Sequence, residues 1–302
     1  MHERGIVPVI REIVEATKEQ DPRDRARFLL VSTVAAIQIK LWEIPAPGST
    51  YFIREFIPRG LSGEKHSEGE DSRHIFGSFN SEPEGQENIP PSGAILVTPN
   101  HWENGPFNGQ WIHLETTRVV KDARLDDKDL HWIARRHTYI PGTSIPMPFS
   151  SMITAHVAKM YSGFLVEPPQ AREKNKKAHT VGQIRPIAEA FKAGEAIGIY
   201  PETEESTRLK RGHYLAGLAA HGLARLNPEG MVCPVGLYSD DRNNLSVKFG
   251  KAYSISELLD KFGWILPREE TEKRKVCRKI SDYMMKKINP LVPVQYRFPE
   301  AP

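Results

Sequence analysis

Short apolar segments separated by helical patterns fill the 302-residue chain from residue 93 onward. Each is a short run rich in aliphatic residues, which is typical of a strand buried on both faces. The predicted strands are "GAILVTP" (93–99), "GFLVEP" (163–168), "EAIGIYP" (195–201), "MVCPVGLY" (231–238) and "LSVKFG" (245–250). Helical patterns such as "YLAGLAAHGLARLN" lie between several of them. This alternation predicts an α/β fold with a mainly parallel central sheet flanked by helices.

The chain on either side of these segments has a different pattern. Residues 7–43 carry apolar positions at helical spacing, which predicts an N-terminal helical pair within residues 1–58. Residues 59–92 are rich in Gly, Ser, Pro and Glu, which predicts a long loop or mobile segment. Residues 93–302 then form the predicted α/β domain, which closes with C-terminal helices at "SISELLDKFG" and "TEKRKVCRKISDYMMKKIN".

The composition narrows the class of protein. With 39% hydrophobic and 26% charged residues the chain is globular, and a formal net charge of +3 is too small to indicate a nucleic-acid partner. Its two cysteines provide no disulfide framework, so we expect a reducing, cytoplasmic location. The most apolar stretch, residues 28–37, is shorter than the roughly 20 residues needed to cross a bilayer. Together with the basic tail helix, it favours peripheral contact with an anionic membrane.

Polar turns follow three of the predicted strands. The first predicted strand ends at Asn100-His101, and the third ends in "YPETEEST" (200–207). The fourth strand ends in "PVGLYSDDR". Ligands of open α/β sheets bind beyond the carboxyl ends of the strands. We therefore expect these three turns to contribute to one site.

His101 has two interpretations. A positioned imidazole can act as a general base and contributes roughly 10²–10⁴-fold to a reaction rate. Its ordinary pKa, about 6.5, suits proton transfer near neutral pH. The alternative is a histidine that only caps or packs the loop. Pro106 and the possible cap Asn104 predict a helix start just beyond, whose free N–H groups could bind an oxyanion or an anionic substrate group.

Four motifs occur in a fixed order within residues 91–253: "LVTPNHWENG", "SGFLVEPP", "IGIYPETEES" and "VCPVGL". Their order and spacing resemble the glycerolphosphate acyltransferase superfamily, which includes the lysophosphatidic acid acyltransferases. The resemblance implies an acyl-CoA or acyl-carrier-protein thioester as donor and a small hydroxyl or amine compound, or a lysolipid, as acceptor. It implies no tightly bound cofactor and no metal, and His131 and His137 also lack a third nearby zinc ligand. A non-catalytic acyl- or lipid-binding relative and a thioesterase-like hydrolase remain alternatives.

The first motif departs from the family at the group that orients the histidine. The family has an aspartate five residues after its histidine, where this chain has Pro106. Glu103, in the turn, would retain the negative charge, whereas Asn108 could fix the imidazole tautomer through its amide oxygen. The resemblance therefore implies a catalytic group of His101 with Glu103 or Asn108.

The second and third motifs lack arginines that are usual in the family. Glu167 and Glu205 stand at those positions, and Arg208 is close enough in sequence to substitute. Glu202 matches the family glutamate and would orient the acceptor or the loop, although a solvated charged turn is the alternative for this segment. The missing arginines predict an acceptor without a phosphate group. The implied substrate-binding residues are Glu202, Thr203, Arg208 and Asn104.

Overall fold

The computed structural model describes most of the chain beyond its N-terminal part. The predicted N-terminal helical pair lies outside the described residues. The described ranges are 65–76, 81–102, 109–135, 150–166, 178–202, 206–239 and 244–298.

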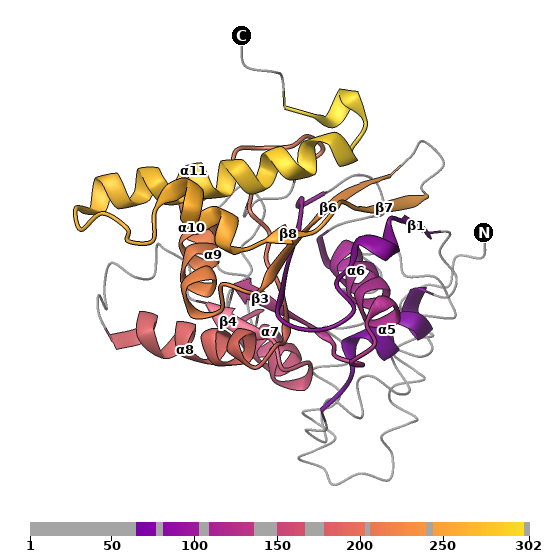
Figure 1. The fold of residues 1–302 in the computed structure, drawn as a ribbon. Coiled ribbons are helices and arrows are strands. Elements are labelled where there is room, and N and C mark those ends of the chain that lie inside the picture. The colour runs from indigo at the N-terminus through magenta and orange to yellow at the C-terminus, as the bar shows by residue number, and fades with distance from the viewer. Residues whose placement is uncertain are drawn as a thin grey trace, which may run out of the picture.

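An eight-stranded sheet lies at the centre of the fold, with the order β1-β7-β6-β2-β5-β3-β4 and with β8 paired to β6 (Figure 1). β6 pairs antiparallel with β7 and β8, and the other pairs are parallel. The predicted mainly parallel sheet is therefore confirmed. The strands are β1 Ser81–Glu84, β2 Ile95–Pro99, β3 Leu130–Arg135, β4 Phe164–Val166, β5 Ala196–Gly198, β6 Met231–Ser239, β7 Leu245–Phe249 and β8 Tyr253–Ser254.

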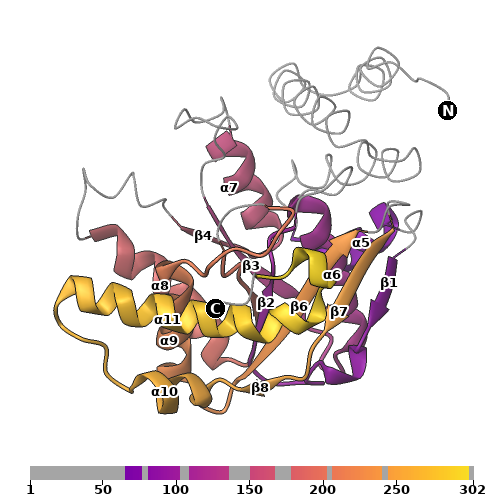
Figure 2. The ribbon, with the colours of Figure 1, turned by 90° about the horizontal axis from the view of Figure 1, so that it is seen from above.

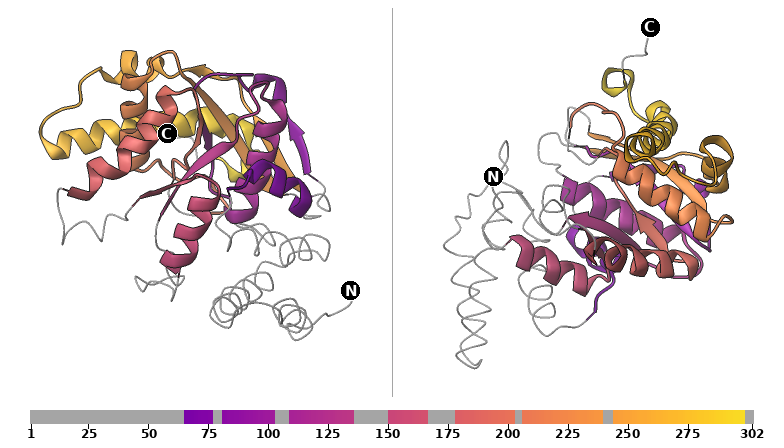
Figure 3. Two further views of the ribbon diagram at one scale, coloured as in Figure 1. Left: turned by 90° about the horizontal axis from the view of Figure 1, so that it is seen from below. Right: turned by 90° about the vertical axis from the view of Figure 1, so that its left-hand side faces the viewer.

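Helices cover both faces of the sheet (Figure 2). α5 and α6 lie on one face and α8 to α11 on the other, as the right-hand view of Figure 3 also shows. Among the described helices, none is both long and apolar enough to span a membrane. The helices are α5 Glu68–Phe76, α6 Gly109–Ala123, α7 Ser150–Met160, α8 Ala178–Lys192, α9 Tyr214–Leu226, α10 Ser256–Phe262 and α11 Glu270–Ile288, with short 3₁₀ turns at η2 Gln86–Asn88, η4 Asn289–Leu291 and η5 Val294–Tyr296.

The side chains of the central strand β2 divide between two apolar clusters. Ile95 and Val97 belong to the cluster that contains Ile112 of α6. Leu96 belongs to the cluster that contains Phe191 of α8. Successive side chains of a strand point to opposite faces, so a continuous apolar run fills both clusters at once. β2 is thereby fixed from both sides, and its carboxyl end gives a rigid base for the residues that follow.

α9 and α11 pack closely because α9 has a glycine at the contact. A Cβ at Gly217 would lie 1.8 Å from the carbonyl oxygen of Cys277, so only glycine permits this approach. Nearer the start of α9, Ser281 Oγ donates a hydrogen bond of 2.6 Å to the carbonyl oxygen of His213. The N–H of His213 donates to the carbonyl oxygen of Pro201, at 2.8 Å. These contacts hold the start of α9 beside the turn that follows β5.

The prediction of a loop over residues 59–92 is wrong where α5 and β1 form. Apolar periodicity does not predict α5 because its buried face is largely polar and includes Glu68, Asp71 and Ser72. Ser72 Oγ donates to the carbonyl oxygen of Glu68 at 2.6 Å, and Asp71 accepts a hydrogen bond of 2.9 Å from the hydroxyl of Tyr161. Hydrogen bonds therefore satisfy a face that apolar contacts fill in most helices. β1, with the sequence "SEPE", is likewise polar and lies at the edge of the sheet.

β3 is a further strand that the apolar pattern does not predict. Its sequence, "LHWIAR", mixes polar and apolar residues. It overlaps "HWIARRH", which contains the two histidines that lack a third nearby zinc ligand. Nδ1 of His131 lies 3.2 Å from the carbonyl oxygen of Tyr161, and its Nε2 lies 3.7 Å from Glu195. His131 thus contacts protein groups on both sides of its ring, while His137 lies outside the described residues.

Candidate functional site

Three of the four sequence motifs meet because their strands are neighbours. β2 lies between β5 and β6, and the three strands run parallel, so their carboxyl ends share one edge of the sheet. The chain leaves β2 through α6 on one face and leaves β5 through α9 on the other. In open α/β sheets, ligands bind at the strand ends where the connections diverge in this way. The second motif, on β4, is separated from β5 by β3.

Asn100 fixes the chain where β2 ends. Its Oδ1 accepts a hydrogen bond of 2.6 Å from the N–H of Leu237, and its Nδ2 donates one of 2.9 Å to the carbonyl oxygen of the same residue. The side chain thus continues the pairing of β2 with β6 for one more residue. Asn100 is buried, whereas His101, the next residue, is partly exposed. The imidazole therefore follows an immobilised backbone, and its Nδ1 atom is buried although the residue as a whole is partly exposed.

Glu202 joins the turn after β5 to the backbone of His101. Its Oε2 accepts a hydrogen bond of 2.7 Å from the N–H of His101, and its Oε1 accepts one from the N–H of Lys210. The carbonyl oxygen of His101 in turn accepts from the N–H of Ser206, at 2.9 Å. Glu202 is only 4% exposed, so its carboxylate binds the backbone of the site rather than facing solvent. Of its two predicted roles, this geometry favours orienting the loop.

The burial of Glu202 gives a testable pH dependence. Desolvation raises the pKa of its carboxyl group from 4.5 to about 7, against the lowering effect of the hydrogen bonds from Lys210 and His101. The folded protein therefore binds this proton more tightly than the unfolded chain. Its stabilising contribution is fully present below about pH 4.5 and is lost as the pH rises through about 7. The shift corresponds to about 3 kcal/mol of unfolding free energy.

Urea denaturation of wild type and Glu202→Gln between pH 4.5 and 8 measures this dependence. The unfolding free energy of Glu202→Gln relative to wild type should increase with pH across the window, because glutamine does not titrate. The exposed Glu229→Gln is the control, and we expect its difference from wild type to be constant. A Glu202→Gln difference that is also constant with pH would contradict the shifted pKa.

A stack of aromatic rings lies against His101. The ring centroids of His101 and Tyr200 are 4.2 Å apart with planes 20° from parallel, and those of Tyr200 and Trp132 are 5.0 Å apart at 16°. Nε1 of Trp132 donates a hydrogen bond of 2.7 Å to Thr117 Oγ1 in α6. Gly198 leaves room for the indole, since a Cβ there would lie 2.6 Å from it. The stack restrains the orientation of the imidazole plane. A group that transfers a proton needs such a fixed orientation toward its substrate.

A buried acid lies at the far end of this stack. His113 of α6 makes an edge contact with Trp132, with ring centroids 5.6 Å apart. Its Nε2 lies 3.1 Å from Oε1 of Glu68 in α5. Burial raises the pKa of the Glu68 carboxyl group, and the hydrogen bond with His113 opposes that shift. Glu68 of α5 thus contacts the end of the stack that lies away from His101, although the sequence pattern predicts a loop where α5 forms.

Only some of the predicted site residues lie in the part of the chain that the structure describes. Arg208 is exposed, and its backbone N–H donates to Ser206 Oγ at 3.2 Å. The structure thus brings Glu202 and Ser206 to His101 and leaves the Arg208 side chain in solvent. The other predicted or compared residues, Glu103, Asn104, Asn108, Glu167, Thr203 and Glu205, lie outside the described residues, so their roles remain predictions.

The sequence pattern assigns no role to three residues of the site, which are Asn100, Tyr200 and Trp132. Asn100 and Tyr200 do carry a signal, because Asn100 directly follows the first predicted strand and Tyr200 is the first residue of the polar turn "YPETEEST". Trp132 carries none, since its strand lacks the apolar pattern.

Within the described part of the chain, no group of three or more His, Cys, Asp or Glu residues is arranged to hold a metal ion. A fixed, stacked and partly exposed imidazole is suited to proton transfer.

Comparison with known proteins finds only distant structural likenesses. No protein-family model and no curated protein sequence matches this chain. The 1-acyl-sn-glycerophosphate (LPA) acyltransferase PlsC from Thermotoga maritima is 14% identical with a TM-score of 0.43, over 83% of this chain and 94% of that chain. The ATPase DotB from Legionella pneumophila is 9% identical with a TM-score of 0.30, over 71% and 60% of the two chains. Likenesses this remote assign no function, and the mixed α/β fold rests on the chain's own strands and helices.

Proposed function

We propose that this protein transfers an acyl group from a thioester of coenzyme A or acyl-carrier protein to a hydroxyl or amine acceptor. The observation that carries the proposal is that two backbone hydrogen bonds and a ring contact hold His101 in place. Its N–H is bound by Glu202, its carbonyl oxygen by Ser206, and its ring by Tyr200, at the shared carboxyl ends of three parallel strands. The thioester donor is what the resemblance of the ordered sequence motifs to the acyltransferase superfamily implies.

In the proposed reaction, His101 removes the proton from the acceptor hydroxyl or amine as its oxygen or nitrogen attacks the thioester carbonyl. The tetrahedral intermediate carries a negative oxygen, and backbone N–H groups near the start of α6 are suited to stabilise it. The intermediate then collapses and expels the thiolate, which takes the proton from the imidazolium. The histidine returns to its starting state, so the cycle needs no covalent acyl-enzyme and no metal.

The test of this proposal is the identity of the product. Purified protein is incubated with a panel of acyl thioesters, with and without alcohols, amines and lysolipids, and the products are measured by mass spectrometry. Acyl transfer gives an ester or amide and one equivalent of free thiol, only when an acceptor is present. Free fatty acid regardless of acceptor would indicate a hydrolase instead, and thioester binding without turnover would indicate a non-catalytic relative.

The residue that orients His101 is a separate prediction within this mechanism. If Glu103 takes the place of the family aspartate, Glu103→Gln should lower turnover by an order of magnitude or more, because the imidazolium then lacks a compensating charge. If Asn108 orients the ring, Asn108→Ala should be the damaging change. Steady-state kinetics of both variants decide between them, with circular dichroism to check folding. Normal turnover in both variants would show that neither residue orients the base.

A further inference from the structure

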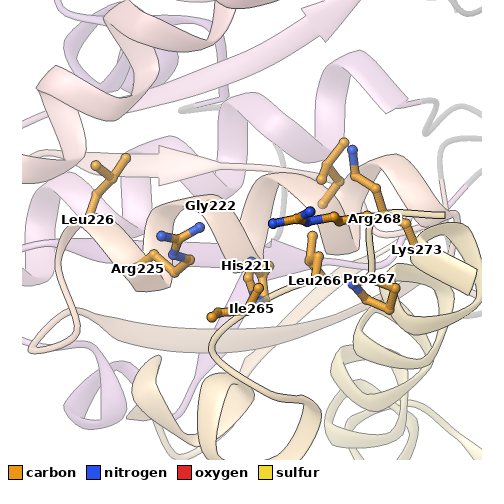
Figure 4. Close-up of a pocket in the computed structure, with 10 residues that line it drawn as sticks. His221, Gly222, Arg225, Leu226, Ile265, Leu266, Pro267, Arg268 and Lys273 are labelled. Atoms are coloured by element: carbon orange, nitrogen blue, oxygen red, sulfur yellow. The ribbon is translucent and has the colours of Figure 1, made fainter. Parts of the chain in front are cut away.

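A groove lies on the outer side of α9, away from His101. The outward stripe of this helix, which includes Leu218, Gly222 and Arg225, forms one wall. The segment between α10 and α11, and Lys273 at the start of α11, form the other (Figure 4). The groove has a volume of about 650 Å³. α9 ends at Leu226, before the amino end of β6, so this surface lies beyond the opposite edge of the sheet from the candidate site.

The segment that forms this wall is anchored to α9. Nε2 of His221 lies 2.9 Å from the carbonyl oxygen of Gly263. His221 is itself 2% exposed, and burial lowers the pKa of its imidazole, which favours the neutral ring. The residues after Gly263 are therefore held beside α9, and the groove is a built feature of the surface.

Two arginines of the groove have no acidic partner within the described part of the chain. Figure 4 shows the guanidinium groups of Arg225 and Arg268 extending over the same hollow. The acids next to Arg268 are already engaged: Glu269 accepts hydrogen bonds from two N–H groups at the start of α11, and Glu270 pairs with Arg274 at 3.0 Å. Two uncompensated guanidinium groups favour an anionic partner, phosphate above all.

Large apolar side chains stand beside these arginines and face the solvent. Ile265 is 81% exposed, Trp264 49% and Leu226 48%. Indole rings with one polar N–H, next to aliphatic side chains and arginines, are typical of the boundary between lipid headgroups and acyl chains. A small soluble anion would use the arginines and leave these three side chains without a role. The combination therefore favours a membrane surface over a free anion.

We propose that Arg225, Leu226, Trp264, Ile265 and Arg268 form a docking surface for a bilayer that contains anionic phospholipid. The two guanidinium groups contact lipid phosphates, while Trp264 and Ile265 enter the interfacial layer. The proposal concerns binding alone and stands whether or not the protein transfers acyl groups.

This docking surface differs from the basic tail helix that the sequence pattern favours. On α11, Arg274 pairs with Glu270 and Lys275 pairs with Glu272, at 3.0 and 2.6 Å. Near its end, Lys287 lies 3.5 Å from Glu257. These pairs engage three of the seven basic residues of the helix. The docking surface is favoured over the helix because its arginines stand beside exposed large apolar side chains.

The experiment is co-sedimentation of the full chain with vesicles of phosphatidylcholine alone and of phosphatidylcholine mixed with phosphatidylserine. Binding should require phosphatidylserine and fall at high salt, because salt screens the attraction. A basic side chain near an anionic surface contributes about fivefold to affinity, so Arg225→Gln with Arg268→Gln should weaken binding about 30-fold. Trp264→Ser with Ile265→Ser should weaken it by at least about tenfold, through lost apolar contact.

Two control variants have matching chemistry away from the docking surface. Lys275→Gln removes a basic residue that is already paired, and Leu125→Ser removes an apolar side chain that is 86% exposed. Both should bind as wild type does, and thermal unfolding should show that every variant is folded. Wild-type binding by both double variants, or no binding of wild type to phosphatidylserine vesicles, would overturn the proposal. Loss of binding through the arginines alone, with inorganic phosphate competing fully, would instead indicate a soluble-anion site and would also overturn it.

Discussion

Replacing His101 with alanine is expected to lower the turnover number for acyl transfer by roughly 10²–10⁴-fold, the usual contribution of a positioned general base. An alcohol or amine acceptor would still bind, but its proton would have to pass to water during the attack. KM should change little, because the imidazole acts on the reacting proton and the remaining contacts of the acceptor are retained. Steady-state kinetics with one thioester and one acceptor provide the measurement.

His74→Ala is the matched control for this change, because His74 is an exposed histidine of α5. It should keep wild-type turnover. Thermal unfolding of His101→Ala should stay cooperative, since Glu202 and Ser206 bind the backbone at position 101 and alanine retains both hydrogen bonds. A folded His101→Ala variant with the wild-type rate would show that this histidine only packs the loop.

The second large effect concerns the acceptor, which we expect to carry no phosphate monoester. Glu167 and Glu205 stand where the acyltransferase superfamily that the sequence motifs resemble usually has arginine. At an effective dielectric constant near 20, two unit charges about 4 Å apart interact by about 4 kcal/mol, so one misplaced carboxylate opposes a phosphate by about 10³-fold in affinity. Uncharged alcohols or amines should therefore be acylated in preference to glycerol 3-phosphate or a lysophosphatidic acid, when all compete for one thioester at equal concentration.

Preferential acylation of either phosphate acceptor would contradict this expectation. Arg208 would then be the residue to examine, because its side chain is exposed and lies in the turn that binds the backbone of His101. In that case Arg208→Ala should raise KM for the phosphate acceptor alone, whereas Arg211→Ala, at another exposed position, should not.

The sequence predicts the parts of the fold that depend on apolar burial. β2 is predicted because every residue of "ILVTP" is buried, and all of β5 and most of β6 are buried as well. α5 and β3 are not predicted, because hydrogen bonds and ring contacts satisfy their buried positions. Asp71, which binds the hydroxyl of Tyr161, and Trp132, which binds Thr117, have partners far away in the sequence. No local pattern encodes such pairs.

The candidate site likewise has one part that the sequence predicts and another that it does not. The placement of His101 and Glu202 at strand ends follows from parallel strands with adjacent carboxyl edges, which the sequence pattern predicts. The contact between them depends on which strands are neighbours, and this requires the order of the sheet. The stack of His101 on Tyr200 and Trp132 further depends on β3 lying next to β5, and β3 is the strand that lacks an apolar pattern. Long-range strand order thus separates the predictable part of the site from the rest.

The close contact of Gly217 with Cys277 has a consequence for thiol chemistry. Cys277 is 1% exposed between α9 and α11, Cys233 is fully buried in β6, and burial raises the pKa of the two thiols to about 11 and about 12. Both therefore react slowly with alkylating reagents in the native protein. Alkylation of Cys277 requires only that α11 separates from α9, whereas alkylation of Cys233 requires the central sheet to open. The ratio of the two alkylation rates thus measures how far α11 detaches as an independent unit before the domain unfolds.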